Sequence, residues 1–397
     1  MTKEGSPFTP GTPVPKEYFI GRATEIERLS RAIRKVNAGK NANVFLMGER
    51  GIGKSSLANL IRKLGQKDCN FIGAHCFINP ENTLGGCCRI IFKRLLEEMP
   101  ANTFEKAKEI MLKYIKNIGL SSGLIGFNIE FTKDEKEIEE LRVDFLPILR
   151  KLFYKSEKKG IIIILDDLNG LSKTPDFALW LKSLVDEMAT SSLGQLPLLL
   201  VLVGTKDVMA DMLKHQPSVG RIFDVVELNP FDKSETRKFF KESFERVKLD
   251  INETALETLA FFSGGLPVIM QELGDATFWL EDEDETIDSK DAMNGVFLAA
   301  ENIGRKYLDP KVYKVIRSKD YLTILRKLPE HFSGQTINRS EILAKFSENE
   351  NKKVDNFLRK MKDLGMLIPG EQRGDYSFAN NLYPLYIKME AERATRR

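Results

Sequence analysis

The chain has 397 residues, of which 42% are hydrophobic and 29% charged, with a net charge of +3. This length accommodates two or three domains, and the composition is that of an ordinary soluble protein. No apolar run is long enough to span a bilayer and the N-terminus lacks a secretory apolar segment, so we expect a cytoplasmic protein without a membrane partner. Four cysteines and three histidines, without ligand spacing, argue against a metal site made of protein ligands alone.

The beginning of the chain is rich in proline. Four prolines between residues 6 and 18 prevent a helix there. We therefore predict an extended N-terminal arm, residues 1–18, that lies on the domain behind it. Apolar residues then recur at helical spacing from Ala23 to about Ala38, which predicts the first helix.

Residues 48–55 match the phosphate-binding pattern G-x-x-x-x-G-K-[ST] at every position. An apolar run precedes the match and a helical pattern follows it, as the motif requires. In such a loop the backbone N–H groups surround a polyphosphate, the lysine meets the β- and γ-phosphates and the hydroxyl binds Mg²⁺. The pattern predicts that the chain binds a nucleoside triphosphate. The assigned residues are Gly48, Gly51, Ile52, Gly53, Lys54, Ser55 and Ser56, with Ser55 also a metal ligand.

Continuous apolar runs alternate with helical patterns up to residue 230. Such runs predict parallel strands covered by helices on both faces of a sheet. The glycine-rich segment 119–131 predicts a loop or hairpin insertion. Further strands are expected at 71–78, 160–165, 198–203 and 222–228, and helices at 84–98, at 103–118 and before Tyr154.

Polar residues follow two of these strands. Asp166 follows the expected strand at 160–165, which we call the isoleucine strand because four of its six residues are isoleucine. A carboxylate at this position reaches Mg²⁺ beside Ser55. Asp167 comes next and is assigned to the attacking water, although it has a shorter reach than glutamate; alternatively it caps the next segment. Thr205 follows the expected strand at 198–203. It would meet the γ-phosphate if that strand lies beside the strand before the phosphate loop and the strand at 160–165. Otherwise it simply closes the strand.

Arg221 and Arg50 are candidate cations for the phosphates. Phosphoryl transfer gains from an arginine aimed at the developing charge, often from a neighbouring subunit. Arg221 precedes the last strand, where an edge of the domain could face such a subunit. We assign it this role, which implies a homo-oligomer; the alternative is an ordinary surface arginine.

The remainder of the chain has a different pattern. Residues 232–280 read as purely helical, and we predict a helical lid at 231–300 that includes an acidic linker at 281–288. For 301–397 we predict a winged helix-turn-helix, with helices at 313–328, 339–346 and 352–364 and a hairpin at 366–378. The segment 311–397 holds 18 Lys and Arg against 11 Asp and Glu.

This basic surplus permits contact with double-stranded DNA. The assigned residues are Lys352, Lys353, Asn356, Arg359 and Lys360 on the third helix and Arg373 at the wing. Phosphate contacts are expected from the cations, and Asn356 or Arg359 would lie near base edges. Two alternatives remain open: a solvated helix face, or a surface that packs on a partner protein.

Taken together, Phe19–Arg22, the phosphate loop, Leu165–Asp167, Val203–Thr205 and Gly264–Pro267 resemble the AAA+/STAND-type ATPases. The resemblance is to the archaeal-type ATPases and Orc/Cdc6-like members with a C-terminal winged helix, and extends from about residue 7 to 388. It implies an α/β fold with the parallel sheet of the ASCE/AAA+ class at 19–230. It further implies that the triphosphate is ATP. By this resemblance Ile20, Gly21 and Arg22 lie near the base of the nucleotide, and Pro267 packs on the adenine.

Two departures from the pattern bear on function. Replicative initiators carry glutamate where this chain has Asp167, and a sensor arginine where it has Gly264–Pro267. Both favour an ATPase that hydrolyses slowly and acts as a switch, whose nucleotide state controls oligomerisation and engagement of DNA or a partner. One alternative is a DNA-engaging loader, initiator or transposition-type ATPase. Another is a nucleotide-bound regulator without turnover, acting through an effector protein in a bacterial defence or signalling module.

Overall fold

The computed structural model describes residues 5–15, 18–78, 83–114, 118–123, 126–131, 141–191, 194–281, 285–331, 336–370 and 372–395. The chain forms two compact units. One, the sheet unit, is Arg22–Asn229; the other, the helical unit, combines Met1–Gly21 with Pro230–Arg397. Two covalent connections therefore join the units.

The sheet unit is built on five parallel strands in the order β2-β5-β6-β1-β7. All five were predicted, and their order places β6 between the first strand and the isoleucine strand β5. Strands β5 and β6 are buried along their whole length, which explains why their sequences show continuous apolar runs. The bounds are β1 Ala42–Gly48, β2 Phe71–Phe77, β5 Gly160–Asp166, β6 Leu198–Gly204 and β7 Asp224–Leu228.

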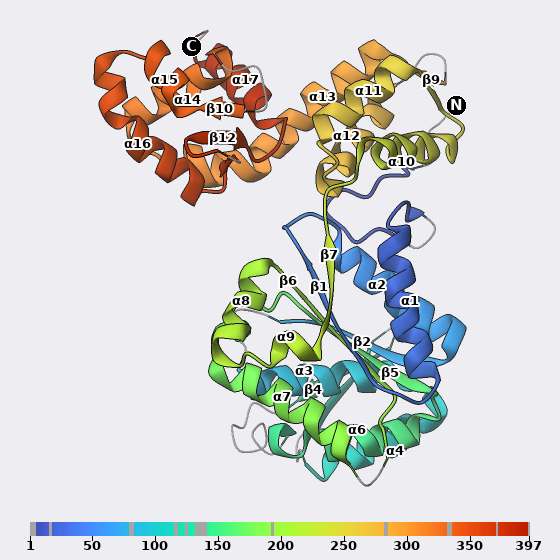
Figure 1. Cartoon of the computed structure of the whole chain (residues 1–397). Coiled ribbons are helices and arrows are strands. Elements are labelled where there is room, and N and C mark those ends of the chain that lie inside the picture. The colour runs from blue at the N-terminus through green and yellow to red at the C-terminus, as the bar shows by residue number, and fades with distance from the viewer. Residues whose placement is uncertain are drawn as a thin grey trace. The chain divides into compact units, whose positions relative to one another are not determined.

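Helices cover both faces of this sheet (Figure 1). Helices α1 and α2 pack on one face, where a Cβ atom at Gly65 would come within 2.3 Å of Ile162 Cδ1. Ile161 and Ile163 point the other way, into a buried cluster with α3, α6 and α7. The helices of the unit are α1 Ala23–Asn37, α2 Lys54–Cys69, α3 Leu84–Glu97, α4 Ala101–Leu112, α6 Phe145–Ser156, η2 Leu171–Lys173, α7 Pro175–Thr190, α8 Lys206–His215 and α9 Val219–Ile222.

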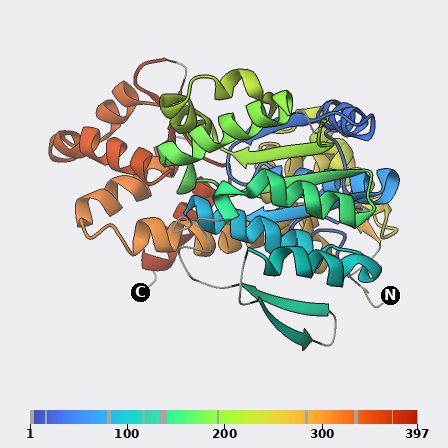
Figure 2. The same cartoon turned by 90° about the horizontal axis from the view of Figure 1, so that it is seen from below.

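One predicted helix ends early and a hairpin follows it. The pattern predicted helix from 103 to 118, but α4 ends at Leu112 and strand β3, Ile118–Gly123, pairs antiparallel with β4, Gly126–Phe131. The prediction is thus wrong for Lys113 and Tyr114, which form a turn, and for Ile118, which pairs across the hairpin; residues 115–117 lie outside the described part. The hairpin predicted at 119–131 is present as a ribbon outside the main sheet (Figure 2).

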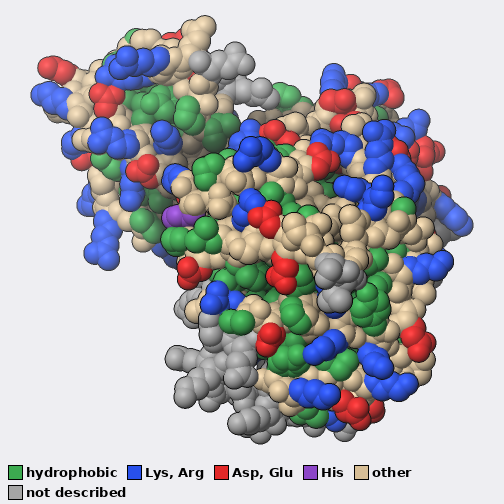
Figure 3. Space-filling model, turned by 60° about the horizontal axis from the view of Figure 1, so that its bottom comes forward, with side chains coloured by type: hydrophobic (Ala, Val, Ile, Leu, Met, Phe, Trp, Pro, Cys, Tyr) green, Lys and Arg blue, Asp and Glu red, His purple; other side chains and the backbone are tan. Residues whose placement is uncertain are grey.

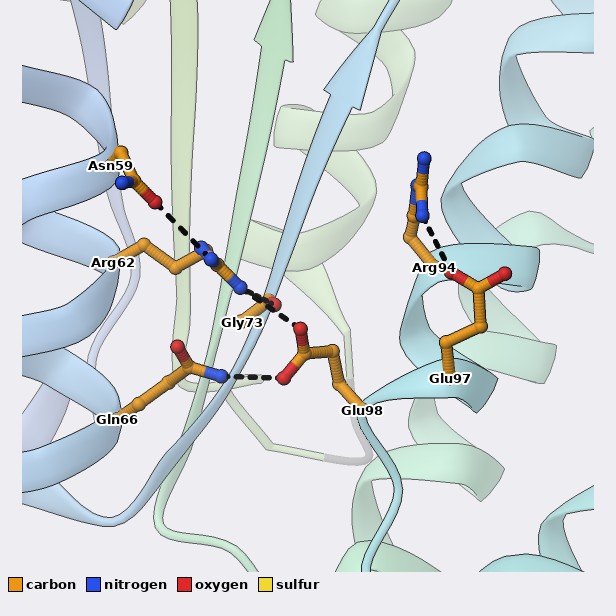
Figure 4. Close-up of polar contacts among 7 residues, drawn as sticks. All are labelled: Asn59, Arg62, Gln66, Gly73, Arg94, Glu97 and Glu98. Atoms are coloured by element: carbon orange, nitrogen blue, oxygen red, sulfur yellow. Dashed lines mark hydrogen bonds and ion pairs between the residues drawn. The ribbon is translucent and has the colours of Figure 1, made fainter. Parts of the chain in front are cut away.

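A polar network ties α2 to the end of α3 (Figure 4). The Arg62 guanidinium donates to Glu98 Oε1 at 2.9 Å, and Gln66 Nε2 donates to Glu98 Oε2 at 2.7 Å. Arg62 also donates to Asn59 Oδ1 at 3.2 Å. Because Asn59, Arg62 and Gln66 all lie on α2, the single carboxylate of Glu98 holds two successive turns of the helix that the phosphate loop precedes.

Within its described residues the helical unit has two separate buried clusters. The first unites α10–α13 with the short parallel pair β8–β9, and the second lies among α14–α17 and the antiparallel sheet β10-β12-β11. The elements are α10 Lys233–Glu245, β8 Asp250–Ile251, α11 Glu253–Ser263, α12 Pro267–Leu280, β9 Thr286–Ile287, α13 Ser289–Ile303, η3 Gly304–Tyr313, α14 Lys319–His331, β10 Thr336–Asn338, α15 Arg339–Lys345, α16 Glu348–Asp363, β11 Leu367–Pro369, β12 Asp375–Phe378 and α17 Tyr383–Thr395.

Three details of the C-terminal part differ from the sequence prediction. The helix predicted at 313–328 begins only at Lys319, because α13 continues as a π-helix that contains Pro310 and ends at Tyr313. Helix α16 begins four residues before the predicted start, in a capping box between Ser347 and Glu350. Its polar first turn hid that start, since the apolar spacing begins at Val354. Strand β10 was not predicted at all.

The N-terminal arm belongs to the helical unit. Phe8 is 3% exposed, and its ring lies edge-on to Phe244 at a centroid distance of 5.1 Å. The backbone N–H of Thr9 donates to Gln271 Oε1 at 2.7 Å. A Cβ atom at Gly274 would meet the Phe8 ring at 2.2 Å, so that glycine makes room for the arm. The arm is therefore part of the core formed by α10 and α12.

We expect Phe8→Ala to lower the unfolding free energy of the helical unit by about 3 kcal/mol, the usual cost of emptying a buried aromatic position. Chemical denaturation followed by helix signal measures this loss. The matched control is Phe261→Ala, because Phe261 is 55% exposed in the same unit. Equal losses in the two variants would contradict an anchoring role for Phe8.

In the described part of the chain every helix is too short or too polar to cross a membrane. The face of the molecule in Figure 3 shows acidic and basic side chains interspersed with hydrophobic ones. A mixed surface of this kind fits the small net charge of +3.

Candidate nucleotide-binding site

The loop between β1 and α2 requires its glycines. Gly51 and Gly53 have φ of 79° and 91°, in the left-handed region that side chains rarely adopt. A Cβ atom at Gly48 would lie 2.9 Å from the carbonyl oxygen of Leu228. Helix α2 begins at Lys54, so its unpaired N–H groups and its positive dipole end face this loop. The local geometry is that of a cradle for phosphate.

Lys54 is held inside the loop. Its ammonium donates to the carbonyl oxygens of Gly48 at 2.9 Å and Glu49 at 2.8 Å. Burial lowers the pKa of Lys54, while the nearby carboxylates of Asp166 and Glu49 oppose that change. A desolvated cation whose partners among the described residues are carbonyl oxygens is poised to exchange them for phosphate oxygens, which carry negative charge.

The buried side chain of Arg22 is hydrogen-bonded to the phosphate loop. It is 4% exposed, and its guanidinium donates to the carbonyl oxygen of Ile52 at 3.2 Å and to Glu25 at 3.2 Å. Its own backbone is left-handed, with φ of 62°. The structure thus gives Arg22 a positioning role on the phosphate loop; its predicted contact with the nucleotide stays a prediction.

Asp166 and Asp167 differ in their surroundings. Asp166 is buried at the end of β5, and its Oδ1 accepts from the backbone N–H of Asp167 at 2.9 Å. Asp167 is exposed, and its backbone is left-handed with φ of 60°. Its Oδ1 accepts from the Asn169 amide. The Asp167 carboxylate is therefore hydrogen-bonded within the turn that follows β5.

His75 is a functional candidate that the sequence prediction missed. It lies on β2, and its Nε2 donates to Asp166 Oδ2 at 3.0 Å, with both side chains under 10% exposed. The His75 ring stacks on Phe77 at 4.6 Å. Each oxygen of Asp166 thus accepts one hydrogen bond, which fixes the orientation of the carboxylate predicted to bind Mg²⁺ and leaves a lone pair on each oxygen for the metal. The signal available in the sequence was a polar residue near the end of the strand that pairs with β5.

The remaining predicted residues of the sheet unit lie at two different edges. Thr205 follows β6, which lies between β5 and β1, and so shares the carboxyl edge of the sheet with the phosphate loop. Ser55 and Ser56 lie in the first turn of α2 at the same edge. Arg221 instead lines a hollow with Ala42 and Asp224, the first residues of β1 and β7. Arg221 therefore lies at the opposite edge from its own phosphate loop.

Ile20, Gly21 and Pro267 belong to the helical unit. Ile20 is 7% exposed in the cluster of α10–α13, and Gly21 packs against the Phe231 ring. Pro267 is the first residue of α12 and is half-buried. Their contact with a nucleotide stays a prediction from the resemblance.

The residues predicted to contact DNA are exposed. Helix α16 buries Val354, Phe357, Leu358 and Met361, and its polar side carries the five predicted residues. Lys353 pairs with Asp320, and Asp355 on the same side accepts two hydrogen bonds from Arg339, at 2.5 and 2.8 Å. The Arg339 guanidinium holds the pKa of Asp355 below its usual range. Exposed on this side remain Lys352, Asn356, Arg359 and Lys360, with Arg373 exposed in the turn before β12.

Comparison with known families fits this geometry. Residues 18–201 match the AAA ATPase domain family. This part of the chain, slightly less than half of it, is similar to an AAA ATPase domain. The match includes the phosphate loop, Asp166 and Asp167, and together with the loop geometry it supports ATPase activity. ATP and Mg²⁺ are the cofactors of this domain.

Solved structures resemble nearly the whole chain at low identity. The Walker-type ATPase of Pyrococcus abyssi is 21% identical, with coverage of 94% of this chain and 97% of that one and a TM-score of 0.51. The ORC2 protein of Aeropyrum pernix, solved in ADPNP–ADP complexes, is 13% identical over 95% of both chains, with a TM-score of 0.56. At such identities these likenesses describe the fold.

A curated relative, an uncharacterised HTH-type transcriptional regulator of Methanocaldococcus jannaschii, is 20% identical over 241 residues. The alignment covers 59% of this chain and 55% of the relative. The chain thus spans about half the length of the curated relative that it matches.

The residues present fit ATP with Mg²⁺. Gly51 and Gly53 hold the left-handed turns of the loop. A Cβ atom at Gly48 would clash with Ile52 Cγ2 and with the carbonyl oxygen of Leu228, each at 2.9 Å. Ser55 and Asp166 offer the hard oxygen ligands that Mg²⁺ prefers. Two protein ligands are enough, because Mg²⁺ usually takes its other ligands from water and from the phosphates of the substrate. Lys54 supplies a cation for the phosphates.

We expect His75→Ala to raise the Mg²⁺ concentration needed for half-maximal turnover about 10-fold, the usual effect of losing a partner of a metal-binding residue. His75→Gln retains a donor and should restore most of the loss. Titrating MgCl₂ at saturating ATP measures both. The control is Phe77→Leu, which removes only the ring beneath His75; if His75→Ala and Phe77→Leu behave alike, His75 acts through packing alone.

Proposed function

We propose that the chain is a slow ATPase that works as a switch, whose nucleotide state controls self-association and the engagement of double-stranded DNA or a partner protein. The observation that carries slow turnover is the state of Asp167. Its carboxylate is short, its backbone left-handed, and it is hydrogen-bonded to Asn169. Each of these limits its reach towards an attacking water.

In this proposal each residue at the carboxyl edge of the sheet has one task. The loop N–H groups and Lys54 bind the phosphates, and Arg22 holds the loop in place. Ser55 and Asp166 would hold Mg²⁺, which supplies charge neutralisation at the phosphate oxygens when it is bound. Asp167 orients the water and accepts its proton, and Thr205 donates to the γ-phosphate.

The place of Arg221 supports self-association. Because Arg221 lies at the amino edge of the sheet, it would contribute to phosphate chemistry only at the site of another subunit. We propose that it does so, and that ATP binding therefore favours the homo-oligomer. Residues 231–300 serve as a lid over the nucleotide, with Ile20, Gly21 and Pro267 as its contacts. The two connections at Gly21–Arg22 and Asn229–Pro230 would allow that movement.

We further propose that residues 301–397 form a winged helix that engages DNA. Helices α14, α15 and α16 followed by the β11–β12 hairpin, with β10 completing a three-stranded sheet, support this assignment. The exposed cations of α16 support the DNA contact, while the Arg339–Asp355 pair reduces the positive charge available there.

The test is ATP turnover together with particle size, each measured with and without duplex DNA. We expect turnover below about 1 s⁻¹, the lower end of ordinary enzymes, and larger particles in ATP than in ADP. Strong stimulation by DNA with a steep salt dependence would favour a loader or initiator instead. Tightly retained nucleotide with no turnover would favour a regulator. Particles of one size in ATP, ADP and no nucleotide would contradict the switch.

A further inference from the structure

A basic hollow lies at the amino edge of the sheet, away from the phosphate loop. It has a volume of about 480 Å³ and is lined by Arg28, Arg31 and Lys35 from α1 and by Arg221 from α9. Among the described residues that line it, Asp224 is the only acidic one. The hollow carries a clear positive excess, and strand β1, seven residues long, separates it from the phosphate loop by about 20 Å.

Part of this charge has no compensation within the described residues. Arg28 is fixed by Asp224 Oδ1 at 2.6 Å and by the carbonyl oxygen of Val225 at 2.9 Å, and Arg31 pairs with Glu27 at 3.2 Å. In the same described part, Lys35 and Arg221 make no hydrogen bond or ion pair and both are exposed. One arginine is thus held rigidly, while two cations point to solvent.

The cations on α1 form a line. Arg28, Arg31 and Lys35 are spaced i, i+3 and i+7, so they share one side of the helix and span about 10 Å along its axis. One strand of a nucleic acid places a phosphate about every 3.4 Å along its axis, so three phosphates pass along that length. The planar forks of arginine match phosphate oxygens two at a time.

The apolar side chains that line the hollow already belong to the protein's own core. Ala42, Val44 and Phe223 are 7%, 2% and 4% exposed, because they pack into the core beneath the hollow. The fully buried centre of a protein interface is usually more apolar than its rim, and among the described large hydrophobic residues that are exposed none lines this hollow. A charged rim over an already buried floor suits a ligand that is bound through its charge.

We propose that this hollow binds the phosphodiester backbone of a nucleic acid, as a second contact independent of α16. Binding there is independent of base sequence, because every group on the rim addresses phosphate. Because α1 belongs to the sheet unit, a nucleic acid bound there would contact that unit directly. This contact would not require the C-terminal residues.

The test uses the full chain and a labelled 20-mer of mixed sequence, as single strand and as duplex, with affinity measured by anisotropy across a salt series. The variant is Arg31→Gln with Lys35→Gln. The matched control is Lys67→Gln with Lys155→Gln, which removes the same charge from two exposed lysines on α2 and α6. Arg221 is left unchanged because the proposed function uses it.

We expect the variant to bind about 10-fold more weakly than the control, with a salt slope smaller by about 1.4 for the single strand or 1.8 for the duplex, the values for two phosphates. The difference should persist when Lys352→Gln and Arg359→Gln are added, which separates this contact from α16. Equal slopes in variant and control would overturn the proposal. So would a change in particle size without a change in affinity, or full competition by poly-glutamate at matched charge.

Discussion

Replacing Lys54 with alanine is expected to weaken ATP binding about 100-fold, in line with the loss of one charged donor to a transferring phosphoryl group. Within the described residues Lys54 donates only to the carbonyl oxygens of Gly48 and Glu49 in the loop, so its charge is available to phosphate. A titration with a fluorescent ATP analogue measures the affinity. Lys63→Ala is the matched control, because Lys63 is an exposed lysine on the same helix.

The expected stability of the variant separates binding from folding. Burial already lowers the pKa of Lys54, so the cation is partly desolvated and costs free energy in the protein without nucleotide. Alanine removes that cost along with two hydrogen bonds, and we expect the midpoint of thermal unfolding without ATP to stay near that of the control. Nucleotide affinity equal to that of Lys63→Ala would contradict the entire nucleotide-site assignment.

The sheet was predictable because each strand carries its own signal. Runs such as 160–165 and 198–203 are apolar at every position, and a strand buried on both faces has that pattern. Strand β10 has three residues and depends on pairing with β12, so nothing local reveals it. Helix α4 likewise ends at Leu112 and strand β3 begins at Ile118, and the pairing of β3 with β4 cannot be recognised from the residues of α4 alone.

The candidate site was predictable only where a motif fixes the backbone. The glycines at 48, 51 and 53 identify the phosphate loop. Asp166 is the last residue of β5, a strand that its apolar run identifies. His75 was missed because its role depends on the adjacency of β2 and β5, which are far apart in the sequence. The left-handed backbone of Asp167 has no sequence signature either, since aspartate adopts it only occasionally.

The two aspartates at the end of β5 lead to the second large effect. Asp167→Asn should lower turnover about 100-fold, the lower end of the contribution of a general base, while ATP affinity stays within about 3-fold. Asp167→Glu should raise turnover, because one more methylene carries the carboxylate towards the water and releases it from Asn169. Steady-state kinetics at saturating ATP and Mg²⁺ compares these variants.

Asp207→Asn is the matched control for these variants, because Asp207 is an exposed acid at the start of α8, the helix that follows Thr205. If Asp167→Asn keeps the turnover of this control, Asp167 merely caps its turn and another group must activate the water. If Asp167→Asn is inactive but Asp167→Glu is no faster than the natural chain, the slow step lies after hydrolysis. Slow turnover would then reflect product release rather than the short reach of the carboxylate.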